Sequence, residues 1–499
     1  MQKESKIEEI ARRRGFFWQS SEIYGGLSGF YDYAHLGTMM KRKWENLWRS
    51  FFLGMDDNFF EIDASEIMPE NVFVASGHIK SFVDPVVKCK KCSNFERADH
   101  LIEAELKENF EGVSLEEMDD IIKKHNIKCP KCGGQLQEVG ILNMMFPLTI
   151  GDSAKAYLRP ETAQSVYVNF RREFETLRKK IPMGLAIIGK AYRNEISPRN
   201  TLIRMRSFTQ AELQIFFNPG KIDRHEKFSE VSGYKLRLFP VEERKDNKII
   251  EITCKETVEK LQIPEFYVYY MAKVQQFYLD VLKVPPKVFR FRQLSDEEKA
   301  FYNKYHWDIE LYLESTGFKE MGGIHYRTDH DLKGHEKISK QDMSVFADEK
   351  KFVPHVLELS FGVDRNVYSL LELFYDEEKD RNLFKFPKLT APYDCAVFPL
   401  VNKDGLPEKA AEIKKLLQDS NFSVFYDGSG SVGRRYRRMD EIGVPACVTL
   451  DNDTLENRTV TLRDRDTMKQ IRIQTKELVT VLKKFLDGEP IEKLGSIVG

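Results

Sequence analysis

The sequence predicts an α+β protein in two parts, a mainly antiparallel sheet with helices followed by a smaller α/β domain. Residues 35–53 place apolar and aromatic side chains at three- and four-residue spacing, as in an amphipathic helix, and a strand-like run over 59–67 follows. Gly and Pro separate further strand-like runs, which lie near 141–149, 156–159, 185–192, 202–208 and 210–217. From about residue 388 single strands and helices alternate, which is typical of an α/β domain. We therefore expect one domain over residues 1–387 and a second over 388–499.

Length and composition indicate a multi-domain protein without a membrane partner. A chain of 499 residues is too long for one ordinary core. Charged residues make up 31% of it, and no run approaches the roughly eighteen apolar residues of a membrane span. The first twenty residues mix Glu with Arg and lack an apolar core, so we expect no secretory signal and a cytoplasmic address. Because the net charge is only −1, local basic patches would have to hold any nucleic acid.

Four of the seven cysteines form two CxxC pairs, which indicate a metal site. They are Cys89, Cys92, Cys129 and Cys132. Two such pairs can direct four thiolates at one tetrahedral ion, so we predict a structural Zn²⁺. An acidic amphipathic stretch lies between the pairs, so residues 89–132 are expected to form an inserted module. A degenerate module, reduced or empty, is the alternative.

The segment over residues 189–217 carries the most specific pattern of charged side chains. Two strand-like runs flank a Ser-Pro-Arg-Asn loop, as in a hairpin with a long turn. Arg193, Glu195, Arg204 and Phe208 can then project toward one side. Guanidiniums there suit phosphate oxygens, and the aromatic ring suits a purine. A solvated, salt-bridged hairpin is the alternative reading of these charges.

A second segment, over residues 354–372, joins a strand to a helix through Gly362. Arg365 falls in the first helical turn, where backbone N–H groups and a guanidinium together favour an anion. A strand-glycine-helix junction is weak evidence by itself, so its meaning depends on the first segment.

Together these segments resemble the class II aminoacyl-tRNA synthetases, and specifically the glycyl form. Residues 189–217 resemble motif 2, written FRNEISPRN…R-x-REF-x-Q-x-E, and residues 354–372 resemble motif 3. Residues 35–69, a helix and a strand-like run that stops at Pro69, resemble motif 1. The resemblance implies a class II antiparallel-sheet catalytic domain and a homodimer with motif 1 at its interface.

Four shorter runs resemble the glycyl family in particular. They are Ala75 to His78, Arg97 to His100, Tyr157 to Gln164 and Glu320 to Asp331. Glycine is the smallest amino acid, so a tight wall can exclude every competitor and no editing domain is required.

Several positions depart from the family's pattern. Tyr192 and Ser207 stand in motif 2 where Phe and Glu are usual, and Leu359 stands in motif 3 where Pro is usual. His325 and Tyr326 are bulkier than the small-polar pair of the glycyl family.

The resemblance implies an ATP site. Arg193 would contact the α-phosphate, Arg204 the triphosphate and Arg365 the γ-phosphate. Phe208 would stack on adenine, and Glu195 would face adenine or the tRNA acceptor end. The implied ATP set is Arg193, Asn194, Glu195, Ile203, Arg204, Arg206, Phe208, Glu320, Met321, Gly362 and Arg365. Mg²⁺ would bridge phosphate oxygens, with Glu320 as the first candidate ligand and Glu310 as the second.

The resemblance also implies a glycine site, in which acidic groups face the ammonium. The implied set is Arg97, Glu161, Phe208, Gln210, Glu212, Arg327, Glu358 and Ser360. Glu161, Glu212, Glu358 and Ser360 would take the ammonium side, and Arg97 and Arg327 would lie near the carboxylate or ATP. The glycine carboxylate would attack the ATP α-phosphate and release pyrophosphate. The glycyl-adenylate would then pass its glycyl group to the terminal ribose of tRNA(Gly), releasing AMP.

In the tail, a Gly-rich loop from Asp427 leads into a helix with four arginines. They are Arg434, Arg435, Arg437 and Arg438. The run resembles the anticodon-binding domain shared by the glycyl, histidyl, prolyl and threonyl synthetases, which implies that these arginines contact tRNA. A solvated basic helix is the alternative, and a phosphate loop is rejected because the Lys-Ser/Thr end is missing.

Two other functions stay open. One is a synthetase-like binding protein that has lost the chemistry; such proteins lack the ATP-gripping arginines, whereas Arg193, Arg204 and Arg365 are present here. The other is a ligase for a different small amino acid, which the acidic set around the ammonium would distinguish.

Overall fold

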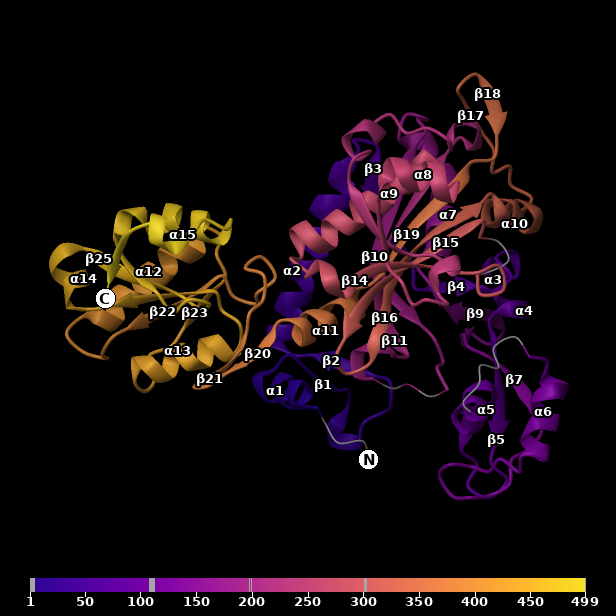
Figure 1. Ribbon diagram of the computed structural model, residues 1–499, viewed down its shortest axis with the longest axis horizontal. Coiled ribbons are helices and arrows are strands. Elements are labelled where there is room, and N and C mark those ends of the chain that lie inside the picture. Colours follow the sequence, from indigo (N-terminus) through magenta and orange to yellow (C-terminus); the bar gives the residue numbers. More distant parts are fainter. Residues whose placement is uncertain (1–4, 107–112, 197, 199, 300–302, 499) are drawn as a thin grey trace.

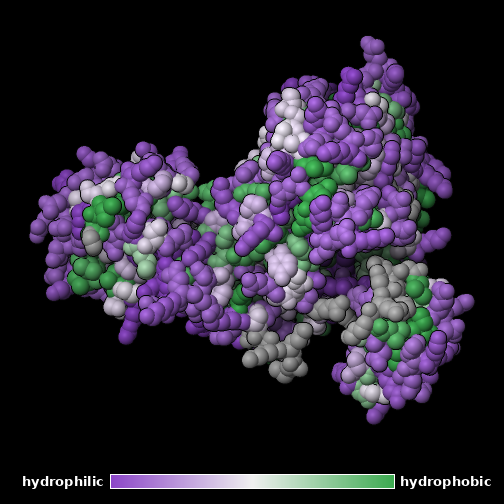
Figure 2. Space-filling view, viewed as in Figure 1, coloured by the Kyte–Doolittle hydropathy of each residue, from purple (hydrophilic) through white to green (hydrophobic). Residues whose placement is uncertain are grey.

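The computed structural model describes residues 5–106, 113–196, 198, 200–299 and 303–498. Figure 1 shows a large central body, a small module below it and a C-terminal body to one side. Hydrophilic residues cover most of the face seen in Figure 2, with scattered apolar patches between them. Within the described residues, every helix is too short or too polar to cross a membrane.

The central body is built on a nine-stranded sheet with the order β13-β12-β14-β15-β16-β19-β11-β10-β3. Every pairing in it is antiparallel except β10 with β3 and β12 with β14. The prediction of a mainly antiparallel sheet is therefore confirmed. The strands are β3 (Phe59–Glu61), β10 (Met183–Tyr192), β11 (Ser207–Phe217), β12 (Lys235–Phe239), β13 (Ile250–Thr253), β14 (Phe289–Gln293), β15 (Tyr305–Leu313), β16 (Gly317–Thr328) and β19 (His355–Gly362).

Strand alternation gives the middle of this sheet two different faces. On β11 and β19 the odd-numbered side chains, such as Leu213 and Leu359, enter the main apolar core. That core is covered by helices α2 (His35–Phe52), α9 (Glu265–Gln276) and α11 (Val363–Leu373). The even-numbered side chains point to the opposite face, because successive residues of a strand alternate. Helices α7 (Ala163–Thr176) and α10 (His330–Ser339) pack on that opposite face.

Two expectations for strands are corrected. The run over 59–67 is split, because β3 joins the central sheet whereas β4 (Ile67–Pro69) pairs with β9 (Ala154–Leu158) in a small sheet with β8 (Phe146–Ile150). The run over 202–208 is not a strand: Thr201–Ile203 form a 3-10 turn, and β11 begins at Ser207. Asn200 and Thr201 have φ of 58° and 53°, a left-handed conformation that ends strand pairing. Ser197 and Arg199 of the predicted loop lie outside the described residues.

The cysteine-bearing module has its own sheet and core. Strands β5 (Val83–Lys88), β6 (Phe95–Arg97) and β7 (Gly140–Asn143) pair in the order β6-β5-β7, beside α5 (Ala98–Leu106) and α6 (Leu115–Lys124). Its core includes Val87, Ile102, Met118 and Ile122. Because β5 pairs with β7, the sheet extends beyond the expected limits of 89–132 on both sides.

The C-terminal body has a six-stranded sheet of order β23-β22-β24-β25-β26-β27 and a separate apolar core. Its elements are β22 (Cys395–Pro399), α12 (Leu406–Asp419), β23 (Val424–Tyr426), α13 (Val432–Glu441), β24 (Ala446–Leu450), α14 (Asn452–Asn457), β25 (Thr459–Asp464), β26 (Gln470–Gln474), α15 (Leu478–Leu486) and β27 (Ser496–Val498). A hairpin of β20 (Tyr375–Glu378) and β21 (Arg381–Phe384) precedes it, and Arg381 donates to the buried Asp440 over 2.9 Å.

Helix α1 (Lys6–Arg14) contacts two distant parts of the chain. Arg13 and Arg14 in its last turn form ion pairs with Glu441, at the end of α13. At its first turn, Glu8 caps the helix and also accepts a hydrogen bond from Thr201, in the turn before β11. Helix α1 therefore ties the C-terminal body to the loop between β10 and β11.

Candidate active site

A cavity of about 210 Å³ opens on the polar face of β11, β16 and β19. Its lining comprises Glu161, Arg193, Glu195, Leu202, Ile203, Arg204, Met205, Phe208, Thr209, Gln210, Glu212, Asn303, His306, Glu320, Gly322, His325, Arg327, Glu358, Ser360, Gly362, Asp364 and Arg365. The register of the sheet explains the gathering: Glu212 lies opposite Ser360, and Glu358 lies opposite His325. Even-numbered residues of β11 and β19 therefore meet odd-numbered residues of β16, such as His325 and Arg327, in one place.

One end of the cavity is acidic and buried. Arg327 is 3% exposed and contacts three carboxylates. Its guanidinium lies 2.8 Å from Asp331, 3.1 Å from Glu358 and 3.4 Å from Glu161. A buried charge requires a partner, and each carboxylate has one in Arg327. One guanidinium among three carboxylates neutralises only part of their negative charge.

Glu212 is held differently, by neutral donors. Thr162 donates to it over 2.6 Å, Ser360 over 2.8 Å and the Gln210 amide over 2.8 Å. Burial and the nearby charges of Glu358 and Glu161 raise the pKa of Glu212 to about 7. A cation placed beside Glu212 would therefore be stabilised.

The two neighbouring acids show the opposite shift. Burial opposes ionisation of Glu358, but Arg327 and His325 outweigh it and lower the pKa of Glu358 to about 2. Burial likewise acts against Glu161, yet Arg327 and His78 hold the pKa of Glu161 well below its usual range. Both are carboxylates at neutral pH, so this end of the cavity favours an ammonium group.

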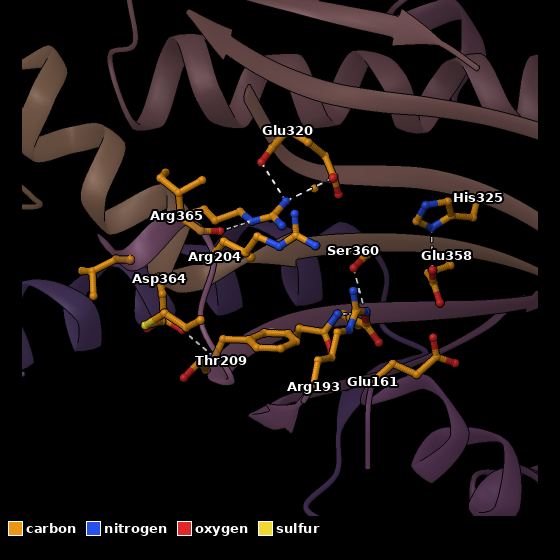
Figure 3. A pocket seen from close by; sticks show the side chains of 18 of the residues that line it. Glu161, Arg193, Arg204, Thr209, Glu320, His325, Glu358, Ser360, Asp364 and Arg365 are labelled. Carbon is orange, nitrogen blue, oxygen red and sulfur yellow. Dashed lines mark hydrogen bonds and ion pairs between the residues drawn. The ribbon is translucent and has the colours of Figure 1, made fainter. Parts of the chain in front are cut away.

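The other end of the cavity carries part-exposed arginines, each beside one carboxylate. The Arg365 guanidinium donates to the Ile203 carbonyl over 2.9 Å and lies 3.1 Å from a Glu320 oxygen. Arg204 lies 2.7 Å from Glu195. In the view of Figure 3, Arg365, Arg204 and Glu320 lie toward one side, and His325, Glu358 and Glu161 lie toward the other.

Arg193 lies between these groups. Its guanidinium stands 5.3 Å from the centre of the Phe208 ring and donates to the Pro160 carbonyl over 3.1 Å. A flat ring and a guanidinium face the same cavity, which suits a purine and its phosphates.

Helix α11 is fixed to β11 by a contact that the sequence did not reveal. Asp364, in its first turn, accepts a hydrogen bond from the Thr209 backbone over 2.5 Å and another from the Tyr33 hydroxyl over 2.8 Å. This bond sets the position of Arg365, the next residue, relative to Phe208.

Some predicted site residues lie outside the cavity lining. Asn194 and Arg206 belong to the loop, where the Arg206 side chain donates to the Glu195 carbonyl over 2.9 Å. Met321 is fully buried in the core. Arg97 lies in the cysteine-bearing module, 3.1 Å from Asp84 and 2.5 Å from Asp99, so two carboxylates already occupy its guanidinium.

The second candidate Mg²⁺ ligand is corrected. Glu310 does not line the cavity but forms a buried ion pair with Arg290 at 2.6 Å. Glu320 does line it, and its side chain is about half exposed.

Several side chains of the site were missed by sequence reasoning. Asp331 ends the run Glu320 to Asp331 but was given no role of its own; it is 2% exposed in α10 and bridges Arg327 and Gln164. His306 lines the cavity and Thr162 donates to Glu212; Thr162 lies in the run Tyr157 to Gln164 but was given no role, and nothing in the local sequence marks His306.

The four cysteines of the CxxC pairs meet in the module. Their sulfur atoms all lie within 4.8 Å of one another. Cys89 and Cys132 are 3.5 Å apart, and Cys92 and Cys129 are 3.7 Å apart. Four sulfurs in such a cluster match the donor set of a tetrahedral structural metal ion.

The four arginines of α13 do not share one environment. Arg434 and Arg437 are exposed, and Arg438 forms an ion pair with Asp427. Arg435 is 2% exposed and donates to the carbonyls of Pro399, at 2.5 Å, and Gly430, at 2.9 Å. The prediction for Arg435 is therefore wrong, because a buried guanidinium with its donors used cannot contact tRNA.

Comparisons with known proteins agree with this architecture. The family model "tRNA synthetase class II core domain (G, H, P, S and T)" matches residues 149–374, and the model "Anticodon binding domain" matches residues 394–485. The glycine–tRNA ligase of Pyrococcus furiosus is 43% identical to this chain, over 97% of the chain and 99% of that protein. That of Pyrococcus horikoshii is 43% identical over 97% and 98%. That of Methanococcus maripaludis is 37% identical over 97% and 100%.

Proposed function

This chain belongs to the glycine–tRNA ligase family, and on that premise we propose that it attaches glycine to tRNA(Gly) with ATP. One observation carries the proposal: a single cavity joins a buried acidic end to an end lined by arginines and an aromatic ring. The acidic end suits the ammonium of an amino acid, and the basic end suits ATP.

At the nucleotide end, Phe208 stacks on adenine and Arg193 takes the α-phosphate. Arg204 and Arg365 hold the outer phosphates, and the part-exposed position of both arginines supports this assignment. Mg²⁺ would be held by Glu320, whose side chain faces the cavity, and it would offset charge on the phosphate oxygens.

At the amino-acid end, the negative groups around Arg327 hold the ammonium, and the close wall of buried side chains excludes a Cβ. Arg327 orients these carboxylates and faces the glycine carboxylate. Glycine and ATP would thus be bound with the attacking oxygen in line with the α-phosphorus, so that orientation supplies much of the rate.

The second step needs tRNA. The exposed arginines Arg434 and Arg437 of α13 face solvent in the domain that matches the anticodon-binding model, and they would contact the RNA backbone. We also propose a cytoplasmic address, where tRNA would be charged for translation.

We also propose that the cysteine cluster holds a structural Zn²⁺. The four thiolates fit its tetrahedral geometry, and the ion would join β5 to the loop before β7. Elemental analysis of freshly purified, reduced protein should give about one zinc per chain, and Cys129→Ser should lose it. Less than half a zinc in the unmodified protein would refute this site.

A homodimer is proposed from exposed apolar side chains that precede the motif 1 helix in the chain. Ile23, Tyr24 and Leu27 are 89%, 87% and 58% exposed, in the 3-10 turn Glu22–Tyr24 and the loop after it. Exposed apolar side chains so close together are typical of an interface. Light scattering coupled to size exclusion should give twice the mass of one chain, and Tyr24→Asp should shift the measured mass toward that of a single chain.

ATP–pyrophosphate exchange with each amino acid in turn tests the main proposal. Exchange should depend on glycine and require no tRNA. Exchange with alanine or serine but not glycine would make the chain a ligase for another amino acid. Absence of any exchange would favour a binding protein that has lost the chemistry.

A further inference from the structure

Helix α1 is held at both ends and in its middle, so it can act as a fixed support for neighbouring segments. Its first turn carries a capping box: Ser5 Oγ accepts from the Glu8 backbone over 3.2 Å, and Glu8 Oε2 accepts from the Ser5 backbone over 2.9 Å. Ile10 and Ala11 are buried in the main apolar core. The last turn forms ion pairs with Glu441. These three anchors favour one position of α1 against the central body.

Glu8 divides its two carboxylate oxygens between two contacts. Oε2 belongs to the capping box, whereas Oε1 accepts a hydrogen bond from the Thr201 hydroxyl, 193 positions along the chain. The capping box is complete without this second contact. The contact with Thr201 is therefore one that the capping of α1 does not require.

The backbone of Thr201 explains why a contact from outside is useful there. Asn200 and Thr201 have φ of 58° and 53°, in the left-handed region. Asn adopts this region more readily than other residues, but a β-branched side chain is rarely found in it. Such a conformation persists only where surrounding contacts hold it. The hydrogen bond to Glu8 is a contact of this kind, so α1 helps to hold the chain in its course at Thr201.

The turn that begins at Thr201 reaches the proposed nucleotide end of the cavity. Thr201–Ile203 form a 3-10 turn, which is closed by a hydrogen bond from the Ile203 N–H to the Asn200 carbonyl over 2.9 Å. The Ile203 carbonyl then accepts from Arg365 Nε, also over 2.9 Å. The position of this turn therefore determines where the Arg365 side chain is held.

Arg365 is oriented by two neighbours. Besides the Ile203 contact, a terminal guanidinium nitrogen donates to the Glu320 carbonyl over 3.0 Å and lies 3.1 Å from a Glu320 carboxylate oxygen (Figure 3). A guanidinium is planar, so contacts at two of its nitrogens fix the direction of the whole group. The Arg365 side chain is 30% exposed and lines the cavity, so it can still meet a ligand. Loss of the Ile203 contact would let the guanidinium rotate.

We propose that Glu8 and Thr201 are positioning residues for ATP. Their contact fixes the 201–203 turn against helix α1. Through the Ile203 carbonyl, the turn then directs Arg365 at the outer phosphates of ATP. The proposal rests on the proposed function, which assigns those phosphates to Arg365. Neither Glu8 nor Thr201 lines the cavity, so both act through another residue.

The test is Thr201→Val, which removes the hydroxyl but keeps the shape and the β-branching of the side chain. In glycine-dependent ATP–pyrophosphate exchange, kcat/KM for ATP should fall roughly three- to tenfold, no more than one hydrogen bond to a charged group contributes. KM for glycine should not change. Thr201→Ser, which keeps the hydroxyl, should retain the kcat/KM of the unmodified protein.

The matched control is Ser5→Ala. It removes the capping hydroxyl of α1 but leaves the hydrogen bond between Glu8 and Thr201 in place. Thermal stability should fall slightly, because one cap of the helix is lost. kcat/KM for ATP should stay unchanged.

A double variant distinguishes positioning of Arg365 from a general loss of structure. If Thr201 acts through Arg365, Thr201→Val should have no further effect once Arg365→Ala has removed the guanidinium. Calorimetry gives an independent measurement, because AMP lacks the outer phosphates. Thr201→Val should weaken the binding of ATP in the presence of Mg²⁺ and leave the binding of AMP unchanged.

Four outcomes would each overturn the proposal. It fails if Thr201→Val has no effect, or if its effect multiplies with that of Arg365→Ala. It also fails if AMP binding weakens as much as ATP binding, or if Ser5→Ala lowers kcat/KM equally. Failure of the proposed function looks different: the unmodified protein would give no glycine-dependent exchange, and the calorimetric comparison of ATP with AMP would still test the role of Thr201.

Discussion

Two buried arginines, one in each large domain, show how differently this protein uses the same side chain. Arg327 in the central body and Arg435 in the C-terminal body are 3% and 2% exposed. The partners of Arg327 include three carboxylates, whereas the Arg435 guanidinium donates to backbone carbonyls. The carboxylates around Arg327 outnumber its single positive charge, so the cavity stays negative. The carbonyls around Arg435 are neutral, so that guanidinium only holds the surrounding backbone in place.

This difference in partners indicates that Arg327 belongs to a binding site and that Arg435 has a structural role. Buried ion pairs add little net stability but cost much when one partner is removed. Backbone carbonyls accept the hydrogen bonds of a buried guanidinium and leave none of its N–H groups free to bind a ligand. Four substitutions of arginines test this distinction, from the largest expected effect to the smallest.

Arg327→Ala should have the largest effect, because it leaves Asp331, Glu358 and Glu161 buried without their cation. We expect the free energy of unfolding to fall by about 3–5 kcal/mol. Glycine-dependent exchange should be lost. Thermal unfolding and exchange measure both effects, and Arg172→Ala, an exposed position on α7, is the control. An active and stable Arg327→Ala protein would contradict the role of Arg327 in the binding site.

Arg365→Ala should reduce exchange without loss of stability. Its side chain is 30% exposed and is proposed to act on ATP in the transition state. A fall in kcat on the order of 10²–10³ is expected for one such group. Unfolding should shift by less than about 1 kcal/mol, because the pair with Glu320 is exposed. A large loss of stability would instead make Arg365 a structural residue like Arg435.

Arg435→Ala should do the reverse. The carbonyls of Pro399 and Gly430 lose their donor, which costs about 1–3 kcal/mol within the C-terminal body. tRNA charging should then fall at temperatures where that body unfolds, whereas tRNA-independent exchange persists. Equal loss of charging at low temperature, with unchanged unfolding, would restore Arg435 to the tRNA surface.

The smallest effect is expected for the double substitution of Arg434 and Arg437 by Ala. Both are exposed, so unfolding should not change. The KM for tRNA should rise roughly tenfold, and the salt dependence of binding should weaken by about one to two phosphate contacts. Exchange should be unaffected. Unchanged charging at every salt concentration would exclude these arginines from RNA contact.

Most helices and strands of the fold could be predicted from the sequence, because the patterns that indicate them are local. The helix over 35–53 appears as α2, and the alternation after residue 388 appears as the C-terminal α/β body. It failed over 202–208, where charged residues read as a strand but two left-handed residues turn the chain. Positive φ at Asn200 and Thr201 depends on contacts from other segments, such as that of Glu8, which no local pattern contains.

At the site, the chain's own motifs pointed to Glu161, Glu212, Glu358 and Arg365, which line one cavity. The pairing of His325 with Glu358 could not be predicted, because it depends on the register of β16 against β19. The environment of Arg435 was equally hidden. Arg434 and Arg437 are exposed, but Arg435 is rotated from Arg434 by about 100° around the helix and points inward.

Helix α1 gives the molecule an unusual order of assembly. It leaves the ribosome long before its partner, because its ion pairs with Glu441 join residues 427 and 428 positions apart. At about 5–20 residues per second, that partner is synthesised roughly 20–90 s later. A helix of nine residues is marginal in water until it packs, so α1 must wait through most of translation before both of its ends are held.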